Sequence, residues 1–351
     1  MKKVLSLVLA LVLTLSLAAC SNSDTADNTE NTDPNQTVTD NTTTDDNWPE
    51  GETISLVVAY TAGGGTDRSC RLLQPFLKKY LGCNVIIENV NGGGGTEVAT
   101  TSVANKPSDG NTILVTNYPD LNWTLAFQDP KGYDENTMEI LMVSMIDPRI
   151  IITQKDSEWD TFTDFIESCK ENPGKYAVAV GQNSGVHALA LYLRDRLGID
   201  YKVVPYDGGG QAGAAVIGNQ VDLAFGDAFS RMDIRDSVKC IGVFGSEKND
   251  IWSEGEPLDQ QLEPYGVTVP TLNRYESYCV KSDLKDINPT RYEKLLQAFI
   301  DASQDPEYLE VVKQNNMESI AVYQTKDQIG DALDGQMEFL KDTIGPLLNA
   351  Q

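Results

Sequence analysis

The fold is decided by one stretch of sequence, Thr53-Ile54-Ser55-Leu56-Val57-Val58-Ala59-Tyr60-Thr61-Ala62-Gly63-Gly64-Gly65-Thr66-Asp67. Its first half is a short apolar run rich in β-branched residues, which is typical of a buried strand in a parallel sheet. The three glycines allow a tight turn, and apolar residues from Arg68 to Leu81 then recur at helical spacing. The stretch therefore predicts a strand, a glycine loop and a helix.

The same unit recurs along the chain. Residues 84–88 predict a second strand, residues 91–95 a second glycine loop, residues 96–104 a second helix and residues 112–116 a third strand. In the second half, strands are expected at 176–180, 202–206 and 221–225, and helices at about 187–197, 212–217 and across 288–348. Strands that alternate with helices indicate an α/β protein with mainly parallel sheets.

The glycine loops form a candidate anion site. Each lies where a strand ends and a helix begins, so free N–H groups at the helix start face whatever binds there and favour negative charge. Ligands of open α/β sheets sit beyond the carboxyl ends of the strands. A nucleotide enzyme is a weaker interpretation, because Arg68 stands at the third glycine position of the dinucleotide pattern and no Gly-Lys-Ser/Thr follows a loop.

An ordered set of motifs resembles the extracytoplasmic receptors of the tripartite tricarboxylate transporter family, also called Bug-type periplasmic binding proteins. The first motif is the deciding stretch, similar to the family's strand followed by P-x-x-A-G-G-G-x-D. The other motifs are Glu88-Asn89 before a glycine loop, Ser108-Asp109-Gly110-Asn111-Thr112-Ile113-Leu114, Asn172-Pro173-Gly174-Lys175, Val204-Pro205-Tyr206, and Gly218-Asn219-Gln220-Val221-Asp222-Leu223. The resemblance runs from about residue 49 to the C-terminus.

The resemblance implies a two-lobed periplasmic-binding-protein fold, type II-like, with a ligand cleft between the lobes. We expect the first lobe to comprise residues 51–148 and 268–351 and the second lobe residues 149–267. The implied function is capture of a small carboxylate-bearing solute and its delivery to the large and small membrane subunits of a tripartite transporter. The implied protein is not an enzyme and needs no cofactor or metal.

The resemblance implies that three loops of this sequence and the end of one strand contact the ligand. Backbone amides from Gly63 to Asp67 and from Gln182 to Gly185 would hold the carboxylate. The predicted ligand-binding residues are Tyr60, Ala62, Gly63, Gly64, Gly65, Thr66, Asp67, Gln182, Asn183, Ser184, Gly185, His187, Tyr206, Gly208, Gly209 and Asp227. Some have a plainer interpretation, since Asp67 could cap the following helix and His187 could be an oriented structural residue.

The sequence also departs from the family pattern. Ala59-Tyr60-Thr61 replaces Pro-Phe-Pro, an arginine is missing before Gly92, and Asp207 stands where a basic residue is frequent. With Asp67, Asp207 and Asp227 flanking the loops and Arg68 as the only nearby base, a tricarboxylate would meet repulsion. We therefore hypothesise a monocarboxylate or an amino-bearing carboxylate.

The N-terminal residues are predicted to be an export signal. Lys2 and Lys3 precede a short apolar run, and Leu17-Ala18-Ala19-Cys20 looks like a bacterial lipobox. This implies a signal peptide at 1–19 and a lipid on Cys20 that anchors the protein to the outer face of the cytoplasmic membrane. Residues 20–50, rich in Asn, Thr and acids, are expected to be a disordered tether.

Composition limits the remaining functions. The net charge of −25 excludes nucleic acid as a partner, because phosphates would be repelled. After Cys20, five cysteines remain without a CxxC, and His187 is the single histidine, so a metal centre or a catalytic thiol has little support. The cysteines are expected to be buried or to form one or two disulfides. A surface interaction or sensing protein on the same scaffold remains the alternative.

Overall fold

The structure, a computed structural model, describes residues 47–93 and 95–349. The predicted signal peptide, Cys20 and most of the predicted tether lie outside these residues. Within the described part, no helix is both long enough and apolar enough to span a bilayer.

The first sheet has six strands in the order β11-β4-β10-β3-β1-β2. β1 pairs in parallel with β2 and β3, whereas β10 runs antiparallel to β3 and β4, and β11 is antiparallel to β4. The strands are β1 (Thr53–Val58), β2 (Asn84–Asn89), β3 (Thr112–Tyr118), β4 (Met138–Asp147), β10 (Arg274–Lys281) and β11 (Ala321–Gln324). The helices before β4 and after β10 are α1 (Gly65–Leu81), α2 (Glu97–Ala104), α3 (Asp120–Phe127), α8 (Leu284–Ile287), α9 (Pro289–Gln304), α10 (Pro306–Gln314), α11 (Lys326–Phe339), η3 (Leu340–Ile344) and α12 (Gly345–Asn349).

The second sheet has five strands in the order β7-β6-β8-β5-β9. β6 is parallel to β7 and β8, and β5 is antiparallel to β8 and β9. The strands are β5 (Arg149–Gln154), β6 (Ala177–Gly181), β7 (Lys202–Tyr206), β8 (Leu223–Asp227) and β9 (Val238–Val243). The intervening helices are α4 (Phe162–Glu171), α5 (Gly185–Leu197), α6 (Gly209–Ile217), η1 (Phe229–Ser237), α7 (Leu258–Leu262) and η2 (Glu263–Tyr265).

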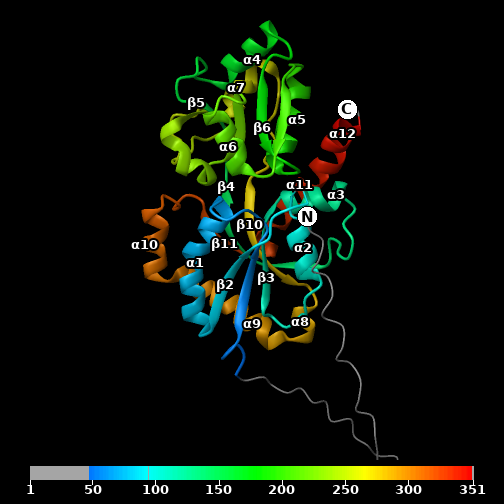
Figure 1. Cartoon of the computed structure of the whole chain (residues 1–351), viewed down its shortest axis with the longest axis vertical. Helices are drawn as coiled ribbons and strands as arrows, with labels where there is room; N and C mark the ends of the chain where they lie inside the picture. Colours follow the sequence, from blue (N-terminus) through cyan, green and yellow to red (C-terminus); the bar gives the residue numbers. More distant parts are fainter. Residues whose placement is uncertain (1–46, 94, 350–351) are drawn as a thin grey trace, which may run out of the picture. The chain divides into compact units, whose positions relative to one another are not determined.

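The chain passes between the sheets twice. β4 ends at Asp147 and β5 starts at Arg149, so only Pro148 separates a strand of the first sheet from a strand of the second. The chain returns to the first sheet as β10, and Figure 1 shows β4 and β10 where the two groups of elements meet. The prediction of a two-lobed α/β fold is confirmed, and each sheet is mixed, because β10 and β11 run against the other strands of the first sheet and β5 runs against the other strands of the second.

Glycine ends the two helices that follow the ligand loops of the first and second sheets. Gly82, after α1, has φ +66°, and Gly198, after α5, has φ +60°. These left-handed conformations favour glycine, and the N–H of each of these glycines donates to a carbonyl in the last turn of its helix. Both helices therefore keep a fixed length, and their N-termini lie at the carboxyl ends of β1 and β6.

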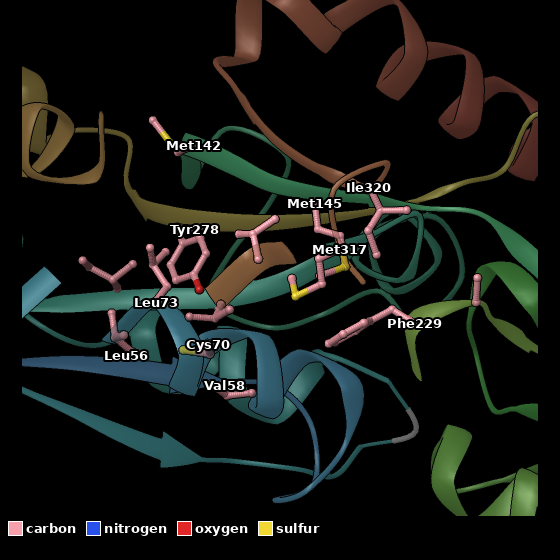
Figure 2. Packing of buried hydrophobic residues seen from close by; sticks show 14 of the residues in the cluster. Leu56, Val58, Cys70, Leu73, Met142, Met145, Phe229, Tyr278, Met317 and Ile320 are labelled. Atoms are coloured by element: carbon pink, nitrogen blue, oxygen red, sulfur yellow. The ribbon is translucent and has the colours of Figure 1, made fainter. Parts of the chain in front are cut away.

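One hydrophobic cluster contains residues from both sheets. It holds Leu56, Val58 and Tyr278 of the first sheet together with Ile150 of β5 and Phe229 of η1. Figure 2 shows Phe229 pointing toward the part of this cluster that contains Met145 and Met317. The segment after β8 is therefore anchored in the same core as the first sheet.

The packed part of the chain begins earlier than the predicted tether boundary. Trp48 is 3% exposed, and its indole N–H donates to Asn111 Oδ1 at 2.8 Å. The ammonium of Lys294 donates to the Trp48 carbonyl at 2.8 Å. The one aromatic residue of the acidic segment thus belongs to the core, and residues 47–50 are not part of a free tether.

The cysteines after Cys20 do not form disulfides. All five are free, four of them buried and Cys83 partly exposed. Burial raises the pKa of Cys169 and of Cys240 to about 12, so these thiols stay protonated at neutral pH. They act as small apolar side chains, which was one of the two predicted outcomes.

Candidate functional site

A cavity of about 300 Å³ lies between elements of the two sheets. The first sheet's loops contribute residues from Tyr60 to Thr66, and the second sheet's loops contribute Gly181, Gln182 and the turn from Asp207 to Gly210. The volume is at the lower end of the range of about 300–1,000 Å³ that is usual for small-molecule sites.

The N-terminus of α1 faces the cavity with open backbone donors. Its N-cap residue, Gly64, has no side chain to accept them. Within the described residues, the N–H groups of Gly65 and Thr66 have no acceptor, and both residues line the cavity. Such donors, at the positive end of a 17-residue helix, favour an anion.

Asp67 holds this loop from behind and does not line the cavity. Its carboxylate accepts from Gly63 N–H at 2.8 Å, from Asn89 Nδ2 at 3.0 Å and from Arg71 Nε at 2.9 Å. Burial alone would raise the pKa of Asp67, but these hydrogen bonds lower it below its usual value. Asp67 is therefore ionised and fixes the position of the glycine turn.

A second set of open donors lies at the N-terminus of α6. Gly208 is the N-cap and offers no side chain, and the N–H groups of Gly209 and Gly210 have no acceptor in the described part of the chain. All three glycines line the cavity. The α1 and α6 N-termini thus present the same kind of surface from opposite sheets.

The N-terminus of α5 is different because protein groups already occupy several of its donors. Gly185 N–H donates to Asp120 Oδ1 at 3.0 Å, and His187 N–H donates to Ser184 Oγ at 3.4 Å. Upstream, Gln182 N–H donates to the Tyr206 carbonyl at 2.8 Å. The predicted use of the amides from Gln182 to Gly185 by a ligand therefore competes with internal acceptors in this structure.

Asp120 is an internal carboxylate at the junction of the two sheets. It starts α3, and in addition to Gly185 N–H it accepts from the Tyr60 hydroxyl at 3.1 Å. Burial raises its pKa above the usual value, although the Arg149 charge and the bond from Gly185 oppose the rise. Nothing in the sequence around it distinguishes this acid from a surface residue.

His187 stacks on an aromatic ring and does not line the cavity. Its ring stacks on the Trp123 ring with centroids 5.0 Å apart, and its Nδ1 accepts from Asn183 N–H at 3.3 Å. Burial lowers the pKa of His187 to about 4, so it is neutral at physiological pH. The structural interpretation of this residue, left open by the sequence, fits these contacts.

Charged side chains of both sheets form a buried network beside the cavity. Arg274, 2% exposed, donates to Asp147 Oδ2 at 2.9 Å and to Thr66 Oγ1 at 2.9 Å. The same guanidinium lies 3.8 Å from Asp227 and 3.7 Å from Glu276. Since Asp147 and Arg274 lie in the first sheet and Asp227 in the second, the network joins the sheets.

Arg149 completes this network from β5. It pairs with Asp227 and donates through Nε to the Leu272 carbonyl at 2.8 Å. Burial would raise the pKa of Asp227, but the nearby arginines hold it below the usual value. For Asp147, burial outweighs Arg274 and raises the pKa to about 6. Asp227 is therefore the firmly ionised member and is already paired.

The third arginine of the cavity wall, Arg231 of η1, is 2% exposed. Within the described residues its side chain has no hydrogen bond and no ion pair within 4 Å. Arg149, Arg231 and Arg274 all line the cavity, which corrects the expectation that Arg68 is the only nearby base. That expectation failed because each arginine comes from a different element and none belongs to a local motif.

Most predicted site residues come together around the cavity. The predicted residues that line it are Tyr60, Ala62, Gly63, Gly64, Gly65, Thr66, Gln182, Ser184, Gly208, Gly209 and Asp227. The predicted residues that do not line it are Asp67, Asn183, Gly185, His187 and Tyr206. Sequence reasoning missed Asn117, Asp120, Ser230 and the three arginines. The one available signal was charge inside apolar strand sequence, as at Asp147-Pro148-Arg149.

Two α/β sheets that share a cavity between loops define a two-lobed binding protein. Residues 70–250 match the tripartite tricarboxylate transporter family receptor, and the chain belongs to that family.

Solved structures with the same fold include the periplasmic binding protein BugD, at 22% identity, with a TM-score of 0.72 and coverage of 84% of this chain and 97% of that one. MatC from Rhodopseudomonas palustris, solved with bound malate, has 20% identity, a TM-score of 0.70 and coverage of 83% and 98%. A further R. palustris structure, with adipate, has 17% identity, a TM-score of 0.72 and coverage of 86% and 98%.

Sequence relatives support the same family. A UPF0065 protein from the gbd 5′ region of Cupriavidus necator is 25% identical over 282 residues, 78% of this chain and 81% of the relative. The UPF0065 protein of the tcbD–tcbE intergenic region of Pseudomonas sp. strain P51 is 26% identical over 201 residues, 56% of this chain and 59% of the relative. BugT of Bordetella pertussis is 28% identical over 172 residues, 48% and 52%. The match thus spans little more than half the length of two of these three relatives.

Proposed function

We propose that this receptor captures a small carboxylate in the cavity between its sheets and delivers it to the large and small membrane subunits of a tripartite transporter. The ligand is bound and released without chemical change, and no cofactor or metal takes part. The observation that carries the proposal is the pair of open helix N-termini, α1 and α6, which face one cavity from opposite sheets.

The mechanism is a difference in affinity between open and closed forms. A carboxylate that contacts the amides of Gly65 and Thr66 and those of Gly209 and Gly210 is held by both sheets at once. Such contacts exist only when the sheets approach each other, so the ligand stabilises the closed form by its extra contacts there. Backbone dipoles fixed before binding need little reorganisation.

The ligand class is a mono-, di- or amino-carboxylate. Structures that share the fold are described with malate and with adipate, and both compounds are small dicarboxylates. The hypothesis of a monocarboxylate or an amino-bearing carboxylate expected a tricarboxylate to be repelled, because Arg68 was taken as the only nearby base, and that assumption about the arginines was wrong. Asp227, which was expected to repel a carboxylate, is neutralised by Arg149 and Arg274.

The proposed location is the outer face of the cytoplasmic membrane, with a lipid on Cys20. The support is the lipobox-like sequence, and Cys20 lies outside the described residues. An anchored receptor stays near its permease, so it does not have to be recaptured after each delivery.

The deciding experiment is mass spectrometry under native conditions of receptor purified without added ligand, followed by thermal unfolding with L-malate, succinate, adipate, L-glutamate and citrate. We expect at least one carboxylate to raise the melting temperature in proportion to the logarithm of its concentration, because only the folded form binds it. Turnover of a probe would indicate an enzyme instead. A protein that no carboxylate stabilises would favour the surface interaction or sensing alternative.

A further inference from the structure

Arg231 lies in a slot formed by glycines. A Cβ atom on Gly226, in β8, would lie 2.5 Å from Arg231 Nε, and one on Gly209, the first residue of α6, would lie 3.1 Å from Nη1. A Cβ on Gly213, one turn further along α6, would be 3.7 Å from the guanidinium carbon. The absence of side chains at these positions lets the guanidinium lie against the end of β8 and the first turn of α6.

This place is electrostatically unfavourable for a cation. The N-terminus of a helix carries partial positive charge, so arginine is disfavoured there. Burial adds a desolvation cost, and it lowers the pKa of Arg231 below its usual value even though nearby carboxylates oppose the shift. A buried charge is ordinarily retained only where a partner of opposite charge compensates it.

The acids around Arg231 are already engaged elsewhere. Asp227 pairs with Arg149 and lies 3.8 Å from Arg274, and Asp147 accepts from Arg274. Asp233, also in η1, lies 3.3 Å from Arg68 Nη1. These carboxylates contribute a field at Arg231 but none of them forms an ion pair with it. The guanidinium and the open amides of α6 therefore face the cavity together, and both are donors only.

We propose that Arg231, with the N–H groups of Gly209 and Gly210, forms the anion subsite of the second sheet and contacts a ligand carboxylate directly. The planar guanidinium can give two parallel hydrogen bonds to one carboxylate. The ligand's negative charge then compensates a cation that the protein leaves without a partner. This inference rests on the proposed function and specifies which charged side chain binds the ligand.

The subsite also adjoins the first sheet's donors. Ser230, next to Arg231, fills the space where a Cβ of Gly65 would stand, so the N-terminus of α1 and η1 are in contact. A carboxylate on Arg231 therefore lies near the α1 amides as well. A carboxylate bound at this point therefore interacts with elements of both sheets and favours the contact between them.

The test compares wild-type protein with Arg231→Gln by calorimetry against L-malate, adipate and L-glutamate. We expect the dissociation constant of each probe that the wild type binds to rise at least tenfold in R231Q, because a charge-assisted hydrogen bond is lost. Higher salt should weaken wild-type binding more than R231Q binding. Arg235→Gln is the matched control, since it removes the same charge from η1 at a residue that does not line the cavity, where it breaks an exposed pair with Glu254 and a cation–π contact with Trp252.

The outcomes separate the two proposals. If the wild type binds a probe and R231Q binds it equally well, the subsite is wrong and the receptor function stands. If the wild type binds none of the three probes, and neither succinate nor citrate, the proposed function fails and the subsite fails with it. If circular dichroism shows that R231Q is misfolded, Gly226→Ala, which retains the arginine but displaces its Nε, decides the question by the same tenfold criterion.

Discussion

Arg274 and Arg231 are the same residue type, equally buried and on the wall of one cavity, yet their surroundings are opposite. Arg274 lies between three carboxylates and a threonine hydroxyl, whereas Arg231 has no hydrogen bond or ion pair to any described residue. Burial would lower the pKa of both, but the surrounding carboxylates raise that of Arg274, while that of Arg231 is lowered.

This difference separates structural from functional charge in a binding protein. A buried cation whose partners are supplied by the protein holds elements together, and its removal leaves acids unpaired. A buried cation without such partners costs stability in the empty protein, and the cost is recovered when an anion arrives. Burial and residue type alone would assign both arginines the same role.

Replacing each arginine by methionine tests most directly whether the two residues have different roles. Arg274→Met should lower the free energy of unfolding by about 3–5 kcal/mol, because it leaves Asp147 and Glu276 buried without their cation. Arg231→Met should be neutral or stabilising, since no ion pair is broken. Urea unfolding of the empty proteins measures both changes. Equal destabilisation by the two substitutions would contradict the distinction.

Substitution of Asp67 tests whether a buried carboxylate that does not line the cavity affects ligand binding by holding the α1 loop in place. Asp67→Ala should raise the dissociation constant of a bound carboxylate more than tenfold, because Gly63 N–H, Asn89 and Arg71 lose a common acceptor and the α1 loop loosens. Glu88→Ala is the control, since Glu88 is an exposed acid on β2 that accepts from Ser55. Normal affinity in the Asp67 variant would reduce its role to helix stability.

The smallest effect concerns His187, a half-buried group that is kept neutral rather than charged. Its folded pKa of about 4 lies below the usual value near 6.5, so the unfolded chain binds more protons between these values and stability falls as pH decreases through them. His187→Phe should flatten this fall while keeping the ring stacked on Trp123. Melting temperatures of both proteins from pH 7 to pH 4.5 measure the difference. Parallel pH profiles would show that His187 carries no such linkage.

The parts of the fold with a local signature were predictable. The apolar run before a glycine loop located β1, and β7 was predicted with the bounds that the structure has, 202–206. Helix starts were placed late, at Arg68 and Ala212 rather than Gly65 and Gly209, because glycine is a poor helix former and hides the first turn. These same first turns carry the open amides of the cavity.

The charged part of the site had no local signature. Arg149, Arg231 and Arg274 are separated by 43 residues or more, and only the folded chain brings them together. β10, with Arg274 and Glu276 inside a buried strand, was not expected as a strand at all. Charged residues within an apolar stretch usually indicate a segment at the protein surface. In this protein the charges lie in the interior and compensate one another.

The glycine at position 226 has a consequence for how this protein could change its preference. One added methyl group there would lie 2.5 Å from Arg231 Nε, so the guanidinium would have to leave its slot. Net charge, the helix N-termini and all the residues expected to contact the ligand would be unchanged in the sequence. A single-carbon change at this glycine of the cavity wall could thus convert an anion receptor into one for less charged solutes, a route to new specificity that comparison of the predicted contact residues alone would miss.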